Sequence, residues 1–170
     1  MIIWTLLLAL ALPATPAGTP PGATVVVVVR HAEKATDHPR DPTLTEAGSA
    51  RARALARRLQ GAGLDAAYAT QYRRTQLTAA PAAAQAGIAV QLRPVDAGNA
   101  ATYGADLAHD LRGLPPGSTA LVVGHSNTVP GIVAALGGQA AGGMPETEYD
   151  RYTVVVLDAD GQARVFTSTY

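Results

Sequence analysis

The hydrophobic positions of this chain form short runs that alternate between strand-like and helix-like spacing. Five consecutive valines, Val25–Val29, are typical of a strand buried on both faces, as in a parallel sheet. The same reading predicts further strands at Asp65–Thr70, Ile88–Leu92, Ala120–Val123, Tyr152–Leu157 and Ala163–Thr167, and helices at Thr45–Gln60, Arg73–Ala86 and Tyr103–Leu111 and from Pro130 onward. This alternation predicts a three-layer α/β/α sandwich with a mainly parallel sheet.

Local signals refine three of these elements. The helix that opens at Thr45 presents several arginines, among them Arg51, which we interpret as its solvated side. Pro81 is expected to split or kink the following helix. The turn at 158–161, Asp-Ala-Asp-Gly, predicts that the sheet ends in an antiparallel pair.

Composition indicates one folded domain behind a leader. The chain has 170 residues, 48% of them hydrophobic, and a formal net charge of zero, which gives no argument for nucleic acid as a partner. Ile2–Leu12 is apolar but too short to span a bilayer, and Pro13–Gly22 is rich in small residues. We therefore expect a bacterial signal peptide and linker over 1–22, a domain over 23–170, and an exported protein, periplasmic or secreted, with no stable membrane insertion after removal of the leader. An uncleaved anchor or a misassigned start remains the alternative.

Three polar sites follow three of the predicted strands. Arg30-His31 comes after the first, Arg73-Arg74 after the second, and His125-Ser126-Asn127 after the strand at 120–123. The carboxyl ends of parallel strands share one edge of a sheet, where α/β proteins place ligands. Two guanidinium groups and two imidazoles at that edge suit a tetrahedral dianion such as phosphate.

Those same residues resemble the motifs of a known family. Arg30-His31-Ala32-Glu33, the segment Thr70–Ala79 and Val123-Gly124-His125-Ser126-Asn127 are similar, in order and spacing, to motifs of the histidine phosphatase superfamily (phosphoglycerate mutase-like), in its compact branch. Leu44–Gly48 resembles the start of the family's first helix. Ala32 stands where the family usually has glycine.

The resemblance implies a phosphomonoester hydrolase that works through a phosphohistidine on His31. Arg30, Arg74 and His125 would then hold the phosphoryl oxygens of a small phosphorylated substrate, and no cofactor is implied. Arg74 is preferred over Arg73 by counting back from Thr78-Ala79.

The proton donor for the leaving group is less well marked. Asp96 follows the strand at 88–92, near the place where related enzymes carry an acid, and is favoured; Glu33 is the other candidate. Asp96 also suits an Asx turn, and Glu33 a loop salt bridge with Lys34. Asn127 and Glu33 are assigned to substrate binding. The glycine-rich segment Gly137–Met144 is interpreted as a mobile surface loop; the alternative is that it flanks the entrance, where Glu146 and Glu148 would disfavour polyanions.

Three other functions compete with hydrolysis. His31, Glu33, Asp37, His38 and His125 are possible metal ligands, but their spacing matches no helical ligand pattern, so no metal is expected. A phosphomutase would need a closed pocket, for which the chain lacks a large insertion. A non-catalytic module that binds phosphate would keep the same four pocket residues.

Overall fold

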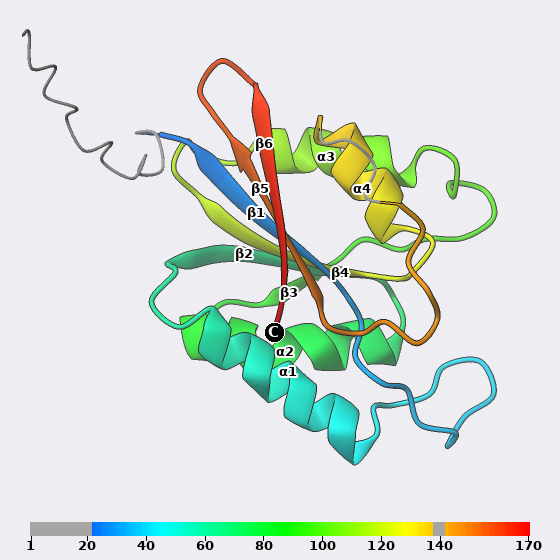
Figure 1. Ribbon diagram of the computed structural model, residues 1–170. Helices are drawn as coiled ribbons and strands as arrows, with labels where there is room; N and C mark the ends of the chain where they lie inside the picture. Colours follow the sequence, from blue (N-terminus) through cyan, green and yellow to red (C-terminus); the bar gives the residue numbers. More distant parts are fainter. Residues whose placement is uncertain (1–21, 138–141) are drawn as a thin grey trace, which may run out of the picture.

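The structure, a computed structural model, describes residues 22–137 and 142–170 (Figure 1). Along the chain the elements are β1 (Thr24–Arg30), α1 (Glu46–Arg58), β2 (Leu64–Ala69), α2 (Arg73–Ala86), β3 (Val90–Leu92), α3 (Tyr103–Arg112), β4 (Thr119–Gly124), α4 (Val129–Ala135), β5 (Arg151–Leu157) and β6 (Ala163–Thr169). The predicted leader, apart from Gly22, and residues 138–141 of the glycine-rich segment lie outside the described residues. No helix within the described ranges is long and apolar enough to cross a bilayer.

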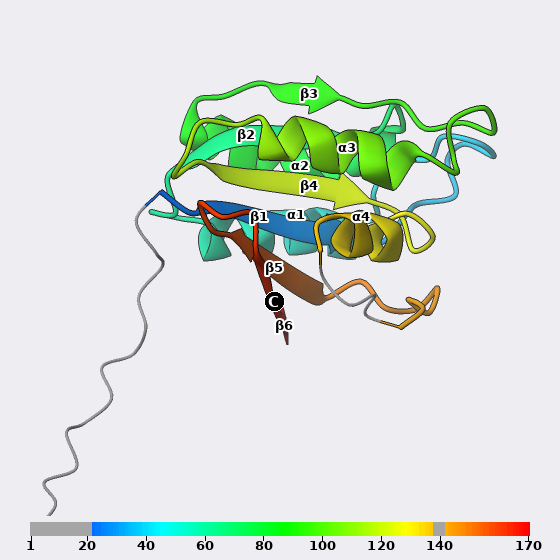
Figure 2. The same cartoon turned by 90° about the horizontal axis from the view of Figure 1, so that it is seen from above.

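The sheet has six strands in the order β3-β2-β4-β1-β5-β6 and is mixed. Strands β1 to β4 run parallel, whereas β5 is antiparallel to β1 and β6 is antiparallel to β5. The expectation of a mainly parallel sheet is therefore wrong. After α4 the chain passes the carboxyl end of β1, where Arg30 contacts residues 145–148, before β5 begins. Because β5 starts at that edge, it can only run back antiparallel to β1 (Figure 2).

Helices cover both faces of the sheet, and the valine strand contributes to both cores. Val27 and Val29 pack in one hydrophobic cluster with residues of α1 and α2, such as Leu55. Val26 and Val28 pack in the other with residues of α3 and α4, such as Ile132 (Figure 1). All four of these valines are buried, as the run of β-branched residues predicted.

Helix α1 begins as expected, whereas helix α2 differs from expectation in one detail. The Thr45 side chain caps α1 by accepting a hydrogen bond from the Gly48 amide at 3.0 Å, as the sequence indicated. Pro81 was expected to split or kink α2; the helix continues through Pro81 as one helix, so the split is wrong. Its first turn begins beside the end of β2, which places Arg74 at the carboxyl edge of the sheet.

Candidate active site

The polar residues that follow β1, β2 and β4 line a single cleft of about 600 Å³ at the carboxyl edge of these strands. Figure 2 shows these three strands ending at the same edge of the sheet. The cleft is lined by Arg30, His31, Lys34, Tyr72, Arg74, Val95, Asp96, Ala97, Ala100, His125, Ser126, Asn127, Thr128 and Glu146. The structure thus brings together Arg30, His31, Arg74 and His125, whereas Arg73 is exposed and is not part of the lining.

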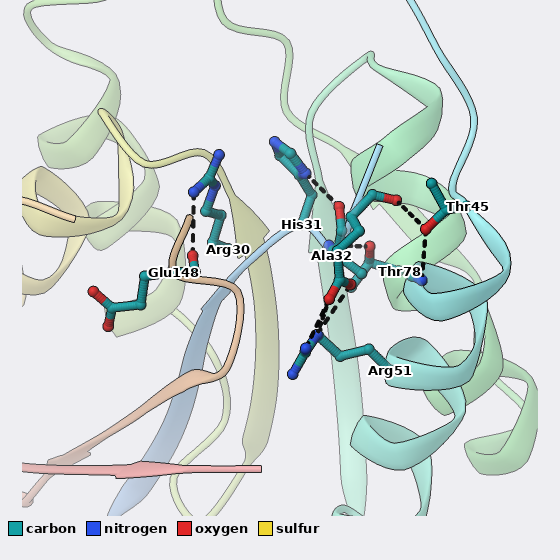
Figure 3. Close-up of polar contacts among 9 residues, drawn as sticks. Arg30, His31, Ala32, Thr45, Arg51, Thr78 and Glu148 are labelled. Atoms are coloured by element: carbon teal, nitrogen blue, oxygen red, sulfur yellow. Dashed lines mark hydrogen bonds and ion pairs between the residues drawn. The ribbon is translucent and has the colours of Figure 1, made fainter. Parts of the chain in front are cut away.

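The His31 ring is held in one orientation by the backbone of the next residue. Its Nδ1 lies 2.8 Å from the Ala32 carbonyl oxygen (Figure 3). A carbonyl can only accept, so Nδ1 carries the proton and Nε2 keeps its lone pair. The Ala32 amide donates to Thr78 Oγ1 at 3.0 Å, and Thr78 Oγ1 in turn donates to the Arg74 carbonyl at 2.7 Å. These bonds fix the end of β1 against α2. The bond at position 32 is made by the backbone amide, so alanine can stand there in place of glycine.

His125 lies beside His31 in the cleft. The two ring centroids are 5.3 Å apart, with 66° between the ring planes. His125 Nε2 is 3.0 Å from Thr70 Oγ1, and the His125 amide donates to Thr128 Oγ1 at 2.9 Å. The His125 ring is therefore held by Thr70, directly after β2, and its backbone by Thr128, directly before α4.

Burial keeps both imidazoles neutral near pH 7. Burial lowers the pKa of His31 to about 4, assisted by the positive charges of Arg74 and Arg30 and opposed by the hydrogen bond to Ala32. Burial likewise lowers the pKa of His125 to about 3, with Arg74 and the His31 ring adding to the effect. A neutral imidazole beside two arginines has the lone pair that a nucleophile needs.

Each of the two cleft arginines has one buried N–H without an acceptor. Arg30 is 1% exposed, and its Nη1 donates to the Pro145 and Glu148 carbonyls at 2.9 and 3.1 Å. The Arg74 guanidinium lies 4.4 Å from the centre of the Tyr72 ring. The Nε of both arginines is buried and unpaired among the described residues. Buried donors are nearly always bonded, so two unpaired ones in a cleft suit an anionic ligand.

Glu146 is the residue of the cleft that the sequence placed least well. Its carboxylate accepts from Arg30 Nη2 at 2.8 Å and from Ser126 Oγ, and it lines the cleft. The hydrogen bond from Ser126 and the charge of Arg30 hold the pKa of this carboxyl below its ordinary value. It was expected near the entrance, but no local pattern indicates a contact with Arg30, 116 residues earlier.

Glu33 is the predicted site residue that does not reach the cleft. Its carboxylate accepts hydrogen bonds from Arg51 of α1, at 3.0 Å from Nε and 2.7 Å from Nη2. Figure 3 shows Arg51 extending from α1 toward the segment that follows β1. A position against substrate and a pair with Lys34 are both corrected by this geometry. Arg51 in turn is half-buried and not part of a solvated face.

The remaining predicted residues lie at the rim. Asp96 is exposed and lines the cleft; its Oδ1 accepts from the Gly98 and Asn99 amides at 2.7 and 3.3 Å, an Asx turn. The turn uses Oδ1, so Oδ2 can still exchange a proton. Asn127 is exposed and also lines the cleft. Over 22–137 and 142–170, no group of three His, Asp or Glu side chains is arranged to hold a metal ion.

Comparison with known proteins gives a family match and a set of similar folds. Residues 26–95 match the family model described as the histidine phosphatase superfamily (branch 1). A protein histidine phosphatase SixA complexed with tungstate is 21% identical, with 85% of this chain and 96% of that chain covered and a TM-score of 0.61. A putative phosphohistidine phosphatase SixA from Nakamurella multipartitia is 24% identical, with 91% and 98% covered and a TM-score of 0.58.

A mycobacterial glucosyl-3-phosphoglycerate phosphatase is 17% identical, with 87% of this chain and 98% of that chain covered and a TM-score of 0.63. The comparison with curated proteins gave no significant match. At these identities the structural likeness concerns the fold.

Proposed function

We propose that this chain, whose residues 26–95 match the family model of the histidine phosphatase superfamily (branch 1), is a phosphomonoester hydrolase that works through a phosphohistidine intermediate on His31. The observation that carries the proposal is the content of the cleft. It holds two buried neutral imidazoles, 5.3 Å apart, beside two arginines that each have an unpaired buried N–H. This set combines a nucleophile with donors for a phosphoryl group.

In the proposed first step, His31 Nε2 attacks phosphorus in line with the ester oxygen. The P–N bond forms as the P–O ester bond breaks, and the leaving oxygen takes a proton from the Asp96 carboxyl. Water then attacks the phosphohistidine and gives a proton to the Asp96 carboxylate. The P–N bond breaks, inorganic phosphate leaves, and His31 returns to its neutral form.

The arginines act on the oxygens that do not react. Arg30 and Arg74 keep their charge at any working pH, so they offset the charge of the phosphoryl group in both steps. Arg30 Nη1 is already bonded to the Pro145 and Glu148 carbonyls, so the Nη2 now held by Glu146 is the Arg30 donor that phosphate would take over, and the unpaired Nε is buried beside it in the same guanidinium. The Nδ1–H bond to Ala32 supports the positive charge that the His31 ring acquires as it attacks.

The test is hydrolysis of para-nitrophenyl phosphate by the mature protein and by two variants. We expect turnover that survives EDTA, loss of turnover in His31→Ala, and normal turnover in His109→Ala, which alters an exposed histidine of α3. Full activity in His31→Ala would show that His31 is not the nucleophile. Phosphate binding without turnover in the unaltered protein would instead indicate a non-catalytic binding module.

Natural substrates are sought among small phosphorylated compounds. Because residues 1–22 predict export, the compounds to be tested as substrates include sugar phosphates, nucleotides and phosphoesters of the cell envelope.

A further inference from the structure

A second groove adjoins the cleft and is lined by basic residues, and we infer that it binds a second anionic group on the leaving part of the substrate. The groove has a volume of about 330 Å³ and is lined by Lys34, Ala35, Thr36, His38, Pro39, Arg40, Pro42 and Arg74. Lys34 and Arg74 line both hollows. A molecule whose phosphoryl group sits at Arg74 can therefore extend past Lys34 into the groove. The inference rests on the proposed function, because it concerns what that reaction accepts.

The loop that forms the groove has a defined shape. Lys34 and Leu44 form an antiparallel bridge, and the Ala35 amide donates to the Thr43 carbonyl at 2.8 Å, which closes the loop at its base. Within it, His38 Nδ1 accepts from the Arg40 and Asp41 amides at 3.3 and 2.9 Å. The backbone that carries Arg40 is thus positioned by internal hydrogen bonds, so less ordering remains to be done when a ligand binds.

The acidic residues of this loop are bonded to other groups. Both oxygens of Asp37 accept from Thr43, from its amide at 2.9 Å and from its hydroxyl at 2.8 Å. Asp41 Oδ1 accepts from the Arg73 amide at 2.7 Å, which joins the loop to the start of α2. Neither aspartate lines the groove. The two carboxylates of the loop therefore stabilise its conformation and its contact with α2.

Among the described residues, the cations of the groove form no ion pair with a carboxylate, although the charge of Asp41 acts on Arg74 and that of Lys34 on Glu146. Four ion pairs occur over 22–137 and 142–170, and none of them includes Lys34, Arg40 or Arg74. The two carboxylates of the cleft, Asp96 and Glu146, are not part of the groove lining. A chain with no net charge thus concentrates three cations on one side of its candidate active site.

This charge distribution selects a substrate class. A leaving group with a carboxylate or a second phosphate would make charge-assisted hydrogen bonds to Lys34 and Arg40, whereas a neutral leaving group would leave them in water. Glu146 acts against a second anion placed on its own side of the cleft. We therefore expect substrates with a phosphomonoester at one end and another anion at the other.

The experiment compares para-carboxyphenyl phosphate with para-carbamoylphenyl phosphate, two esters of nearly equal shape that differ in charge. Para-phenylene bisphosphate distinguishes a second phosphate from a carboxylate. We expect kcat/KM to be about fivefold higher for the charged esters than for the amide, an effect of the size that exposed ion pairs give. In Lys34→Gln combined with Arg40→Gln this ratio falls close to one. Arg57→Gln, on the exposed side of α1, leaves the ratio unchanged.

Equilibrium binding of the same esters to the His31→Ala protein is measured in parallel, because it does not depend on turnover. A preference for the charged esters that disappears in the Lys34/Arg40 double variant supports the groove. Equal binding of charged and neutral esters, or a preference that the double variant keeps, would overturn it. If the unaltered protein hydrolyses neither ester, the proposed function fails, while the binding comparison still decides the role of the groove.

Discussion

The segment of residues 30–33 has two sides, each with an arginine–carboxylate pair, and the two pairs differ in kind. On the helix side, Glu33 and Arg51 are bonded through two guanidinium nitrogens, and their side chains are 23% and 27% exposed. On the cleft side, the Arg30 side chain is 2% exposed, whereas Glu146 is 72% exposed. In the first pair both side chains are half-buried, and the pair joins α1 to the segment that follows β1. The second joins a buried cation to an exposed carboxylate.

From this difference we expect the helix side of residues 30–33 to contribute to stability and the cleft side to contribute to catalysis. On the helix side, the backbone of Glu33 lies so close to α1 that a Cβ added to Gly48 would come within 2.4 Å of the Glu33 carbonyl oxygen. Substitutions there should reduce stability. Substitutions on the cleft side should change the chemistry and leave the fold. The predictions below test this separation.

Among substitutions that leave the proposed nucleophile in place, the largest effect is expected from a cleft arginine. Arg74→Ala removes a charged donor from the phosphoryl group, and we expect kcat/KM to fall at least about a hundredfold, the scale for loss of one transition-state donor. Arg73→Ala, at the exposed neighbouring position, should change it by less than about twofold. Steady-state kinetics on both variants provides the measurement. Equal losses, or a larger loss in Arg73→Ala, would contradict the placement of Arg74.

The matching helix-side substitution is Gly48→Ala. Its methyl group would collide with backbone, so we expect the free energy of unfolding to fall by about 2 kcal/mol, within the range for overpacking. Gly131→Ala in α4 is the control, because its Cβ would meet nothing within 4 Å and alanine favours helix. Urea denaturation measures both. An unchanged stability in Gly48→Ala would show that the helix-side contact is looser than described.

Acid should weaken the fold through the cleft-side histidine. His31 has a pKa of about 4 in the folded protein against an ordinary 6.5, so the unfolded state binds more protons between these values. The free energy of unfolding should therefore fall as the pH falls from 6.5 to 4, by about 2 kcal/mol at pH 5 from this residue. His31→Gln should reduce the loss between pH 7 and pH 5. Denaturation midpoints at both values check this, and an equal loss in the variant would contradict it.

The smallest effect concerns the cleft carboxylate. Glu146→Gln removes the charge that competes with phosphate for Arg30, and we expect inorganic phosphate to bind about threefold more tightly, as fits an exposed ion pair. Glu33→Gln should leave phosphate affinity unchanged and lower stability. Isothermal titration calorimetry measures the affinities. Weaker binding in Glu146→Gln would show that Glu146 assists phosphate and does not compete with it.

The comparison also shows what the sequence could and could not predict. The strand of valines, the Thr45 cap and the residues at the ends of β1, β2 and β4 were predictable, because they depend on local spacing and on the shared edge of parallel strands. The first turn of α2 placed Arg74, and not Arg73, in the cleft lining.

The features that could not be predicted depend on contacts between residues that are far apart in the sequence. The direction of β5 and the contact between Glu146 and Arg30 both follow from the path of residues 142–150 past the end of β1, which no periodicity encodes. The pairing of Glu33 with Arg51 is of the same kind, since 18 residues separate them and the arginine spacing on α1 suggested a solvated face. Asp96 fits both the Asx turn and the rim of the cleft, so its role as proton donor remains a proposal.

The most direct test is capture of the phosphorylated protein. Brief mixing with a phosphomonoester labelled in its phosphoryl group, followed by quenching in alkali and peptide mapping by mass spectrometry, should place the label on His31, with the acid-labile, alkali-stable behaviour of a phosphoramidate. Continued turnover with no labelled intermediate, or label on another residue, would contradict a phosphohistidine at position 31.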